Sequence, residues 1–196
     1  MRCPPAAIAA RCGRWAYLSR EEAALPRRLA RRRKPADPHR ALREHVVALL
    51  EGGDAHVRFE EAVADWPTDL RAVKPAGQPF TPWHVLEHIR ISQWDIVEFT
   101  NSPKHVSPEW PRGYWPSDNS PPDAREWDNS VAQVIRDRGA MKRLVTAPGT
   151  DLFARLPHGT GQTALREALV LADHNAYHVG QLLLLRRLLG AWTDDR

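Results

Sequence analysis

Residues 172–181, ADHNAYHVGQ, lie in a long apolar segment near the C-terminus and decide the fold and the site of this chain. His174 and His178 are four positions apart in it. On a helix this spacing places two imidazoles on one face, with Cβ atoms about 6 Å apart, where they can chelate one divalent metal ion. A second segment, residues 83–89 (WHVLEHI), carries another histidine pair at the same spacing. Two helices that each present histidines predict a metal site between them.

The composition is that of one ordinary soluble domain. The chain has 196 residues, of which 42% are hydrophobic, which is enough for a core. No apolar run reaches the roughly 18 residues of a membrane span, and the N-terminus lacks the pattern of a secretory signal. The two cysteines, Cys3 and Cys12, both precede the periodic part of the chain. We therefore expect a cytoplasmic protein without disulfides.

The basic charge is concentrated at the N-terminus. Residues 1–37 hold ten basic and three acidic residues, whereas the rest holds eighteen basic and twenty-one acidic residues. This segment has no sustained periodicity, so we expect a disordered basic extension, or a start codon placed too far upstream. A nucleic-acid arm and an Arg-rich presequence are the alternatives. The net charge of +4 is therefore no evidence for a fold that binds nucleic acid.

Helical periodicity and capping signals predict four long helices and no strand. The first would begin at Asp37-Pro38, bend near Gly52 and Gly53, and end before Pro67. The others would span residues 82–101, 124–147 and 164–189, with N-caps at Thr81, Asp123 and Thr163 and with Glu126 completing a capping box at Asp123. Residues 102–122 contain six prolines and form a long loop of the kind that often serves as a lid. We expect an all-α, antiparallel up-down-up-down four-helix bundle, in which the second and fourth helices run parallel.

The chain resembles the DinB/YfiT-like superfamily of metal-dependent four-helix-bundle enzymes. The resemblance is carried by residues 83–95 and 173–181, together with 110–116 (WPRGYWP) and 158–163 (HGTGQT), and it extends over about residues 38–192. It implies a DinB-like domain at 38–196 with three histidines on one divalent metal. Two of these come from the fourth helix and one from the second. Carried onto this sequence, the ligands are His88, His174 and His178, with His84 as the rival of His88.

Three neutral imidazoles leave coordination positions open, as catalytic metal sites do. Zinc or nickel suits such a ligand set, and iron fits as well. Asn175 stands where a zinc protease with an HExxH motif has its glutamate, so that general base is missing. The resemblance implies transfer of a low-molecular-weight thiol, as co-substrate, to an electrophile. Hydrolysis by metal-activated water and a non-catalytic stress-response or interaction bundle are the alternatives.

Three further residues are candidates for a catalytic role. Gln181, seven positions after His174, could hydrogen-bond a ligand or metal-bound water. Asp95, seven after His88, could do the same or be a buried acid paired with an arginine. Tyr177 could line the pocket or pack in the core. We expect a small-molecule substrate, leave homodimer formation open, and expect neither nucleic acid nor a membrane as partner.

Other aromatic and histidine side chains are expected away from the site. The tryptophans of the helices and of the long loop are assigned to the core: Trp83, Trp94, Trp115 and Trp127. The histidines without a partner four positions on are assigned to the surface or to helix ends: His39, His45, His56, His105 and His158. Of these, His158 could border a pocket.

Overall fold

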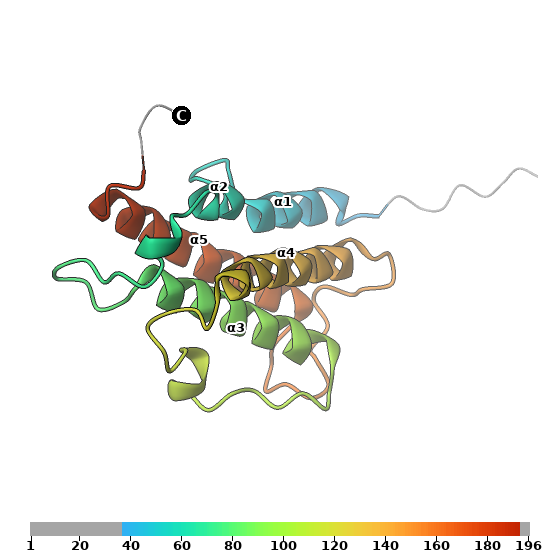
Figure 1. Ribbon diagram of the computed structural model, residues 1–196. Coiled ribbons are helices and arrows are strands. Elements are labelled where there is room, and N and C mark those ends of the chain that lie inside the picture. Colours follow the sequence, from blue (N-terminus) through green and yellow to red (C-terminus); the bar gives the residue numbers. More distant parts are fainter. Residues whose placement is uncertain (1–36, 193–196) are drawn as a thin grey trace, which may run out of the picture. The chain divides into compact units, whose positions relative to one another are not determined.

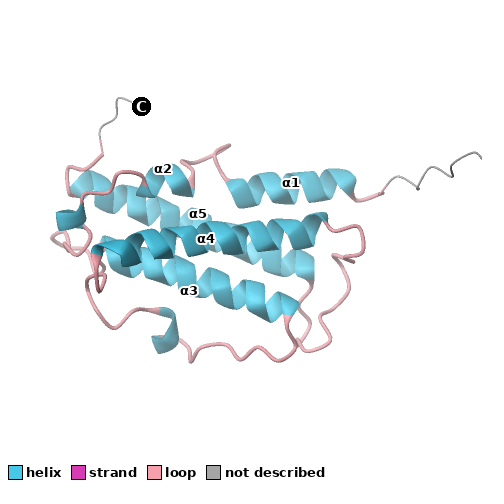
Figure 2. Cartoon of the chain, turned by 45° about the vertical axis from the view of Figure 1, so that its right-hand side comes forward, coloured by secondary structure: helices cyan, strands magenta, loops and turns pink. Residues whose placement is uncertain are grey.

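The computed structural model describes residues 37–192, and within them all regular secondary structure is helical apart from one isolated bridge between Arg155 and Thr163 (Figures 1 and 2). The prediction of a disordered extension at 1–37 lies outside the described residues except for Asp37. The helices are α1 (Arg40–Glu51), α2 (Phe59–Val63), α3 (Pro82–Asn101), α4 (Ala124–Thr146) and α5 (Ala164–Leu188), with the 3₁₀ turns η1 (Thr68–Leu70) and η2 (Arg112–Tyr114). Among the described residues, no helix has the length and apolarity that a membrane crossing requires.

The prediction of one bent first helix is wrong, because the glycine pair breaks the helix. Gly52 and Gly53 have φ values of +69° and +98°, in the left-handed region that a right-handed helix cannot contain. Helix α1 therefore ends at Glu51, and the separate helix α2 begins at Phe59. The N-cap position of α1 is His39 and not Asp37 as expected. Asp37 does not cap the helix but accepts hydrogen bonds from the His39 amide and the Arg43 side chain.

The other three helices begin where their capping residues predict. Thr81, Asp123 and Thr163 each accept a hydrogen bond from a backbone amide of the first helical turn. At the start of α3 the cap is reciprocal, since the His84 amide donates to the Thr81 hydroxyl and the Thr81 amide donates to Nδ1 of the His84 ring. The His84 imidazole is therefore used in capping its own helix.

The up-down-up-down order is wrong, because α3 and α5 run antiparallel. Gln93 in the middle of α3 contacts Asn175, and Phe99 near its end contacts His158, which precedes α5. Helices α3 and α4 run parallel instead: Glu87 pairs with Ser130, and Gln93 pairs with the Val134 carbonyl further along both helices. The colours of Figure 1 show the same directions, from right to left along α1 and α5 and from left to right along α3 and α4.

The long loop makes this up-down-down-up order feasible. A helix of about 20 residues is about 30 Å long, and a loop of about 22 residues can span more than twice that length. Residues 102–123 use this length to return from the end of α3 to its start, where the Asn119 carbonyl accepts a hydrogen bond from the Thr81 hydroxyl. The return path runs beside α3, so the loop lies against the helix that carries His88.

Two buried apolar clusters hold the four long helices together. One joins α2, the first half of α3, α4 and the C-terminal half of α5 around Trp66, Trp83 and Trp127. The other joins α1, the second half of α3, α4 and the N-terminal half of α5 around Met141. Gln93, which is fully buried, lies on α3 between the parts that these clusters occupy. The polar side chains that could bind a ligand are thus held on helices whose other faces are fixed by packing.

Candidate metal centre

Helices α3 and α5 bring three histidines together. His88, His174 and His178 each offer a ring nitrogen, and these nitrogens all lie within 4.8 Å of one another. The Nε2 atoms of His88 and His174 are 3.1 Å apart. Zn–N bonds of about 2.0–2.1 Å in a tetrahedral shell place two ligand nitrogens about 3.4 Å apart, which is close to this separation. The cluster therefore has the ligand number and spacing of a small metal site.

The outward nitrogens of two of the rings are fixed by hydrogen bonds. Nδ1 of His88 donates to the Tyr114 carbonyl at 2.8 Å, and Nδ1 of His178 donates to the Gln181 side-chain oxygen at 2.7 Å. An oxygen of this kind only accepts, so the proton of each neutral ring must lie on Nδ1. Each ring therefore presents an unprotonated Nε2 as a metal ligand would.

The third ring, His174, has a buried ring nitrogen without a hydrogen-bond partner. Because Nε2 of His88 has no proton, the proton between these two rings belongs to Nε2 of His174. Nδ1 of His174 is then an unprotonated acceptor, and it is buried without a well-formed hydrogen bond, as is Oδ1 of the adjacent Asn175. If Nε2 of His174 bound a metal, its proton would move to Nδ1, where Asn175 Oδ1 can accept it. The two unpartnered atoms fit a metal-bound state better than a metal-free one.

The electrostatics keep all three rings neutral near pH 7. Burial and, to a smaller extent, the neighbouring His88 together lower the pKa of His174 to about 4, with Asn175 acting weakly in the opposite direction. Burial also lowers the pKa of His178 to about 4, with the charges of His174 and His88 adding to the effect. The pKa of His88 is lowered by burial and held up in part by its bond to Tyr114. Neutral imidazole is the form that binds a metal.

The returning loop covers the His88 side of the cluster. The Trp115 ring stacks on His88 with a centroid distance of 3.9 Å and an interplanar angle of 2°, and Phe80 stacks near Trp115 at 4.1 Å. The sequence predicted Trp115 to lie in the core, but its side chain is half-buried and covers one side of the site. Trp83 and Trp127 are in the core as expected, whereas Trp94 is half-buried beside the loop.

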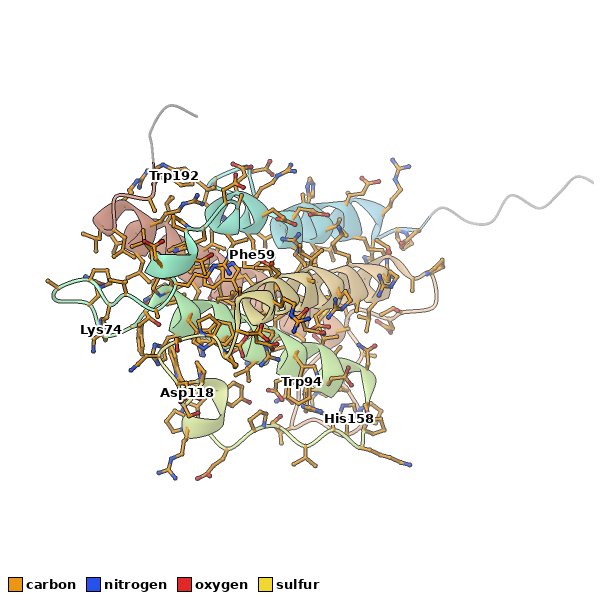
Figure 3. All side chains as sticks on the ribbon, in the orientation of Figure 1. Phe59, Lys74, Trp94, Asp118, His158 and Trp192 are labelled. Carbon is orange, nitrogen blue, oxygen red and sulfur yellow. The ribbon has the colours of Figure 1, made fainter. Side chains whose placement is uncertain are left out.

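Asp95 does not reach the three histidines and does not pair with an arginine. Its two oxygens accept hydrogen bonds from the Tyr114 hydroxyl at 2.6 Å and from Nε2 of His105 at 2.7 Å. The His105 side chain is only 7% exposed, so it is not a surface residue; it follows the end of α3, the other location expected for it. His158 is also partly buried and contacts the Phe99 carbonyl, and Figure 3 shows it beside the C-terminal end of α3.

Gln181 and Tyr177 lie on the solvent side of the cluster. Gln181 accepts from His178 through its oxygen and donates to the Tyr177 hydroxyl through its nitrogen at 3.2 Å. Tyr177 is 65% exposed, so it does not pack in the core. Beside Gln181 lies a shallow depression of about 70 Å³, lined by Gln78, Phe80, Val85, Gln181, Leu184 and Leu185 among others. A small apolar group could enter there, one helical turn from His178.

The structure decides which histidine of α3 joins the pair on α5. His88 is in the cluster, and His84 is not, because His84 is turned toward the cap at Thr81. The contacts of Tyr114 and Trp115 with His88 had no sequence signal of their own. Both residues lie in the proline-rich loop and in the stretch 110–116 that carries part of the resemblance, but neither feature indicated a contact with His88.

Comparison with known proteins agrees with this architecture. Residues 52–182 match the DinB superfamily, and the chain belongs to this superfamily. The match contains the whole of α3 and α4 and all three histidines. No curated protein and no solved structure matches the chain.

Proposed function

We propose that His88, His174 and His178 bind one divalent metal ion through their Nε2 atoms. The observation that carries this proposal is the pair of unpartnered buried atoms, Nδ1 of His174 and Oδ1 of Asn175, which a metal on Nε2 would allow to pair. The fixed tautomers of the other two rings and the low pKa values support it. Three protein ligands leave room for substrate, which is typical of catalytic sites. Zinc and nickel suit three imidazoles best.

We further propose that the protein is a metal-dependent transferase that adds a small thiol to an electrophilic substrate. When bound, the metal would supply a Lewis acid that lowers the pKa of a thiol and makes it a nucleophile. Among the described residues, the buried acids near the cluster are already engaged. Asp95 accepts from two donors, and Glu87 is bonded to Arg90 and Ser130. A thiol, whose ordinary pKa is about 8.5, needs far less activation by a metal than water, at about 15.7.

The chain's own residues would orient the reactants. The Gln181 side chain holds His178 and borders the apolar depression, so a substrate seated against Leu184 and Phe80 would reach the metal from that side. The Trp115 ring covers one face of the His88 ring and stacks in turn on Phe80, which lines the depression. Such shielding strengthens electrostatic interactions within the site.

The test begins with metal binding and continues with turnover. Protein stripped with a chelator is reloaded with zinc or nickel, its metal content is measured by elemental analysis, and it is assayed with a panel of small thiols and a chromogenic electrophile. We expect one metal per chain and chelator-sensitive thiol transfer. His174→Ala should lose both, whereas His45→Ala, an exposed histidine of α1, should retain both.

Two outcomes would replace this proposal. Hydrolysis of an ester or amide without thiol transfer would assign the site to a hydrolase. Full metal loading with neither activity would favour a non-catalytic bundle. Absence of metal from the wild type after loading would overturn the metal site itself.

A further inference from the structure

The returning loop makes two independent contacts with the histidine of α3. The Tyr114 carbonyl accepts the His88 Nδ1 proton at 2.8 Å, and the next residue, Trp115, stacks on the same ring. These contacts fix both the tautomer and the plane of His88. The other two histidines share one helix and are placed by α5 itself, so His88 is the ligand whose geometry depends on a separate segment.

This segment is held in place by one buried carboxylate. Asp95 lies two turns after His88 on α3 and is 8% exposed. One of its oxygens accepts from the Tyr114 hydroxyl at 2.6 Å, and the other accepts from His105 Nε2 at 2.7 Å. His105 and Tyr114 stand at the beginning and the middle of the loop, so Asp95 fastens both parts to α3.

The bond between Tyr114 and Asp95 is stable against titration of the phenol. Burial and the neighbouring Asp95 raise the pKa of Tyr114 to about 12. The hydroxyl therefore stays a donor through the physiological range, and Tyr114 is held at its side chain by Asp95 while its carbonyl holds His88.

We infer that Asp95 is a positioning residue for the metal site: through Tyr114 it fixes the loop that keeps His88 in the Nδ1–H tautomer with Nε2 free. This inference rests on the proposed function in its metal-binding part. Asp95 touches neither the three histidines nor the depression beside them. Its effect would reach His88 through Tyr114, which contacts both residues. Partners that orient ligating histidines typically contribute 10- to 100-fold to metal affinity.

The first readout needs no metal. In the stripped protein at pH 7, ¹⁵N–¹H spectra of the imidazoles report the tautomer of each ring, and His88→Gln identifies the His88 signals. We expect Nδ1–H for His88 in the wild type. Tyr114→Phe, which removes only the hydroxyl, and Asp95→Ala should shift His88 toward a mixture of both tautomers.

The second readout is the binding of Co²⁺, whose visible absorption reports ligand geometry. Both variants should bind Co²⁺ at least about 10-fold more weakly than the wild type, with an altered spectrum. Asp95→Asn keeps an oxygen acceptor for Tyr114 and should recover most of the affinity. Asp137→Ala removes a half-buried acid of α4 that bonds Gln133, and it should leave both readouts unchanged.

The outcomes separate the two proposals. Wild-type tautomer and wild-type Co²⁺ spectrum in both Tyr114→Phe and Asp95→Ala would overturn the positioning role. Equal losses in Asp137→Ala would overturn it as well, because the effect would then be general destabilisation. A wild type that binds no Co²⁺ would overturn the proposed metal site, while the tautomer measurement would still decide whether Asp95 holds His88.

Discussion

The free energy of unfolding of the metal-free protein should fall between pH 6.5 and 4, because two buried histidines stay unprotonated in the folded state while the unfolded chain binds protons there. Burial lowers the pKa of His174 and of His178 from 6.5 to about 4. A histidine with a lowered folded pKa contributes stability that is fully present above the unfolded value and is lost as pH falls toward the folded value. Without allowance for solvent, two shifts of this size would correspond to a loss of about 7 kcal/mol over this pH range. Partial solvent exposure of the rings reduces the expected loss to about 2–4 kcal/mol, which is an average slope of roughly 1–1.5 kcal/mol per pH unit.

The assay is urea unfolding followed by circular dichroism, with a chelator present, at intervals from pH 7 to pH 4. Carboxylates also titrate in this range, so the informative quantity is the difference between variants. His178→Gln removes one titrating ring and should lower the slope by roughly half of the histidine part, whereas His45→Gln should not change it. The same slope in His178→Gln and the wild type would refute the reasoning, whatever the absolute stabilities. Bound metal should raise the wild-type curve without removing its slope, because the metal keeps the folded rings unprotonated while the unfolded chain still binds protons.

Three other predictions follow from particular contacts. His88→Ala should lower metal content at least about 10-fold, while His84→Ala should keep the metal and lose about 1 kcal/mol with its helix cap, as measured by elemental analysis and unfolding. Gly52→Ala should destabilise the fold by about 1–2 kcal/mol, because an L side chain is strained at the φ of +69°; an unchanged urea midpoint would contradict this. Deleting residues 1–35 should change the unfolding free energy by less than about 1 kcal/mol, and a larger loss would show that this segment docks on the bundle.

Helix positions could be predicted because their signals are local. A capping residue and a proline at the first turn predict the start of α3, and the observed helix, Pro82–Asn101, has the expected bounds. The glycine pair is also local, but whether it bends or breaks a helix depends on packing. Here the chain leaves the helix at the glycines and forms a new helix from Phe59, and Phe59 and Val63 of α2 are buried in the core cluster with α5.

Helix direction could not be predicted, because a loop as long as residues 102–122 permits either order. The pairs that reveal the direction, such as Gln93 with Asn175, are 82 positions apart in sequence and share no periodicity. The error did not affect the site. A ligand in the middle of α3 meets the middle of α5 whether the two helices run parallel or antiparallel.

Some features of the candidate site could be predicted from the sequence, and others could not. The spacing of His174 and His178 is periodic and therefore visible, and the resemblance supplied the choice of His88 over His84. The groups that orient these rings are a backbone carbonyl of Tyr114 and an amide oxygen of Gln181. A carbonyl has no sequence signature, so the dependence of His88 on the loop, and of the loop on Asp95, appears only in three dimensions.

The polar residues around the cluster are arranged to hold protons in place rather than to move them. Gln93 donates to the Val134 carbonyl, so its oxygen must face Asn175, whose nitrogen donates to it at 2.7 Å. This leaves Asn175 Oδ1 as a pure acceptor, at the position where an HExxH enzyme has a glutamate that takes up a proton. An amide cannot act as such a base at neutral pH, but it can fix the tautomer of His174. Under the proposed function, such a site would suit a nucleophile that gives up its proton readily on contact with a metal, as a thiol does.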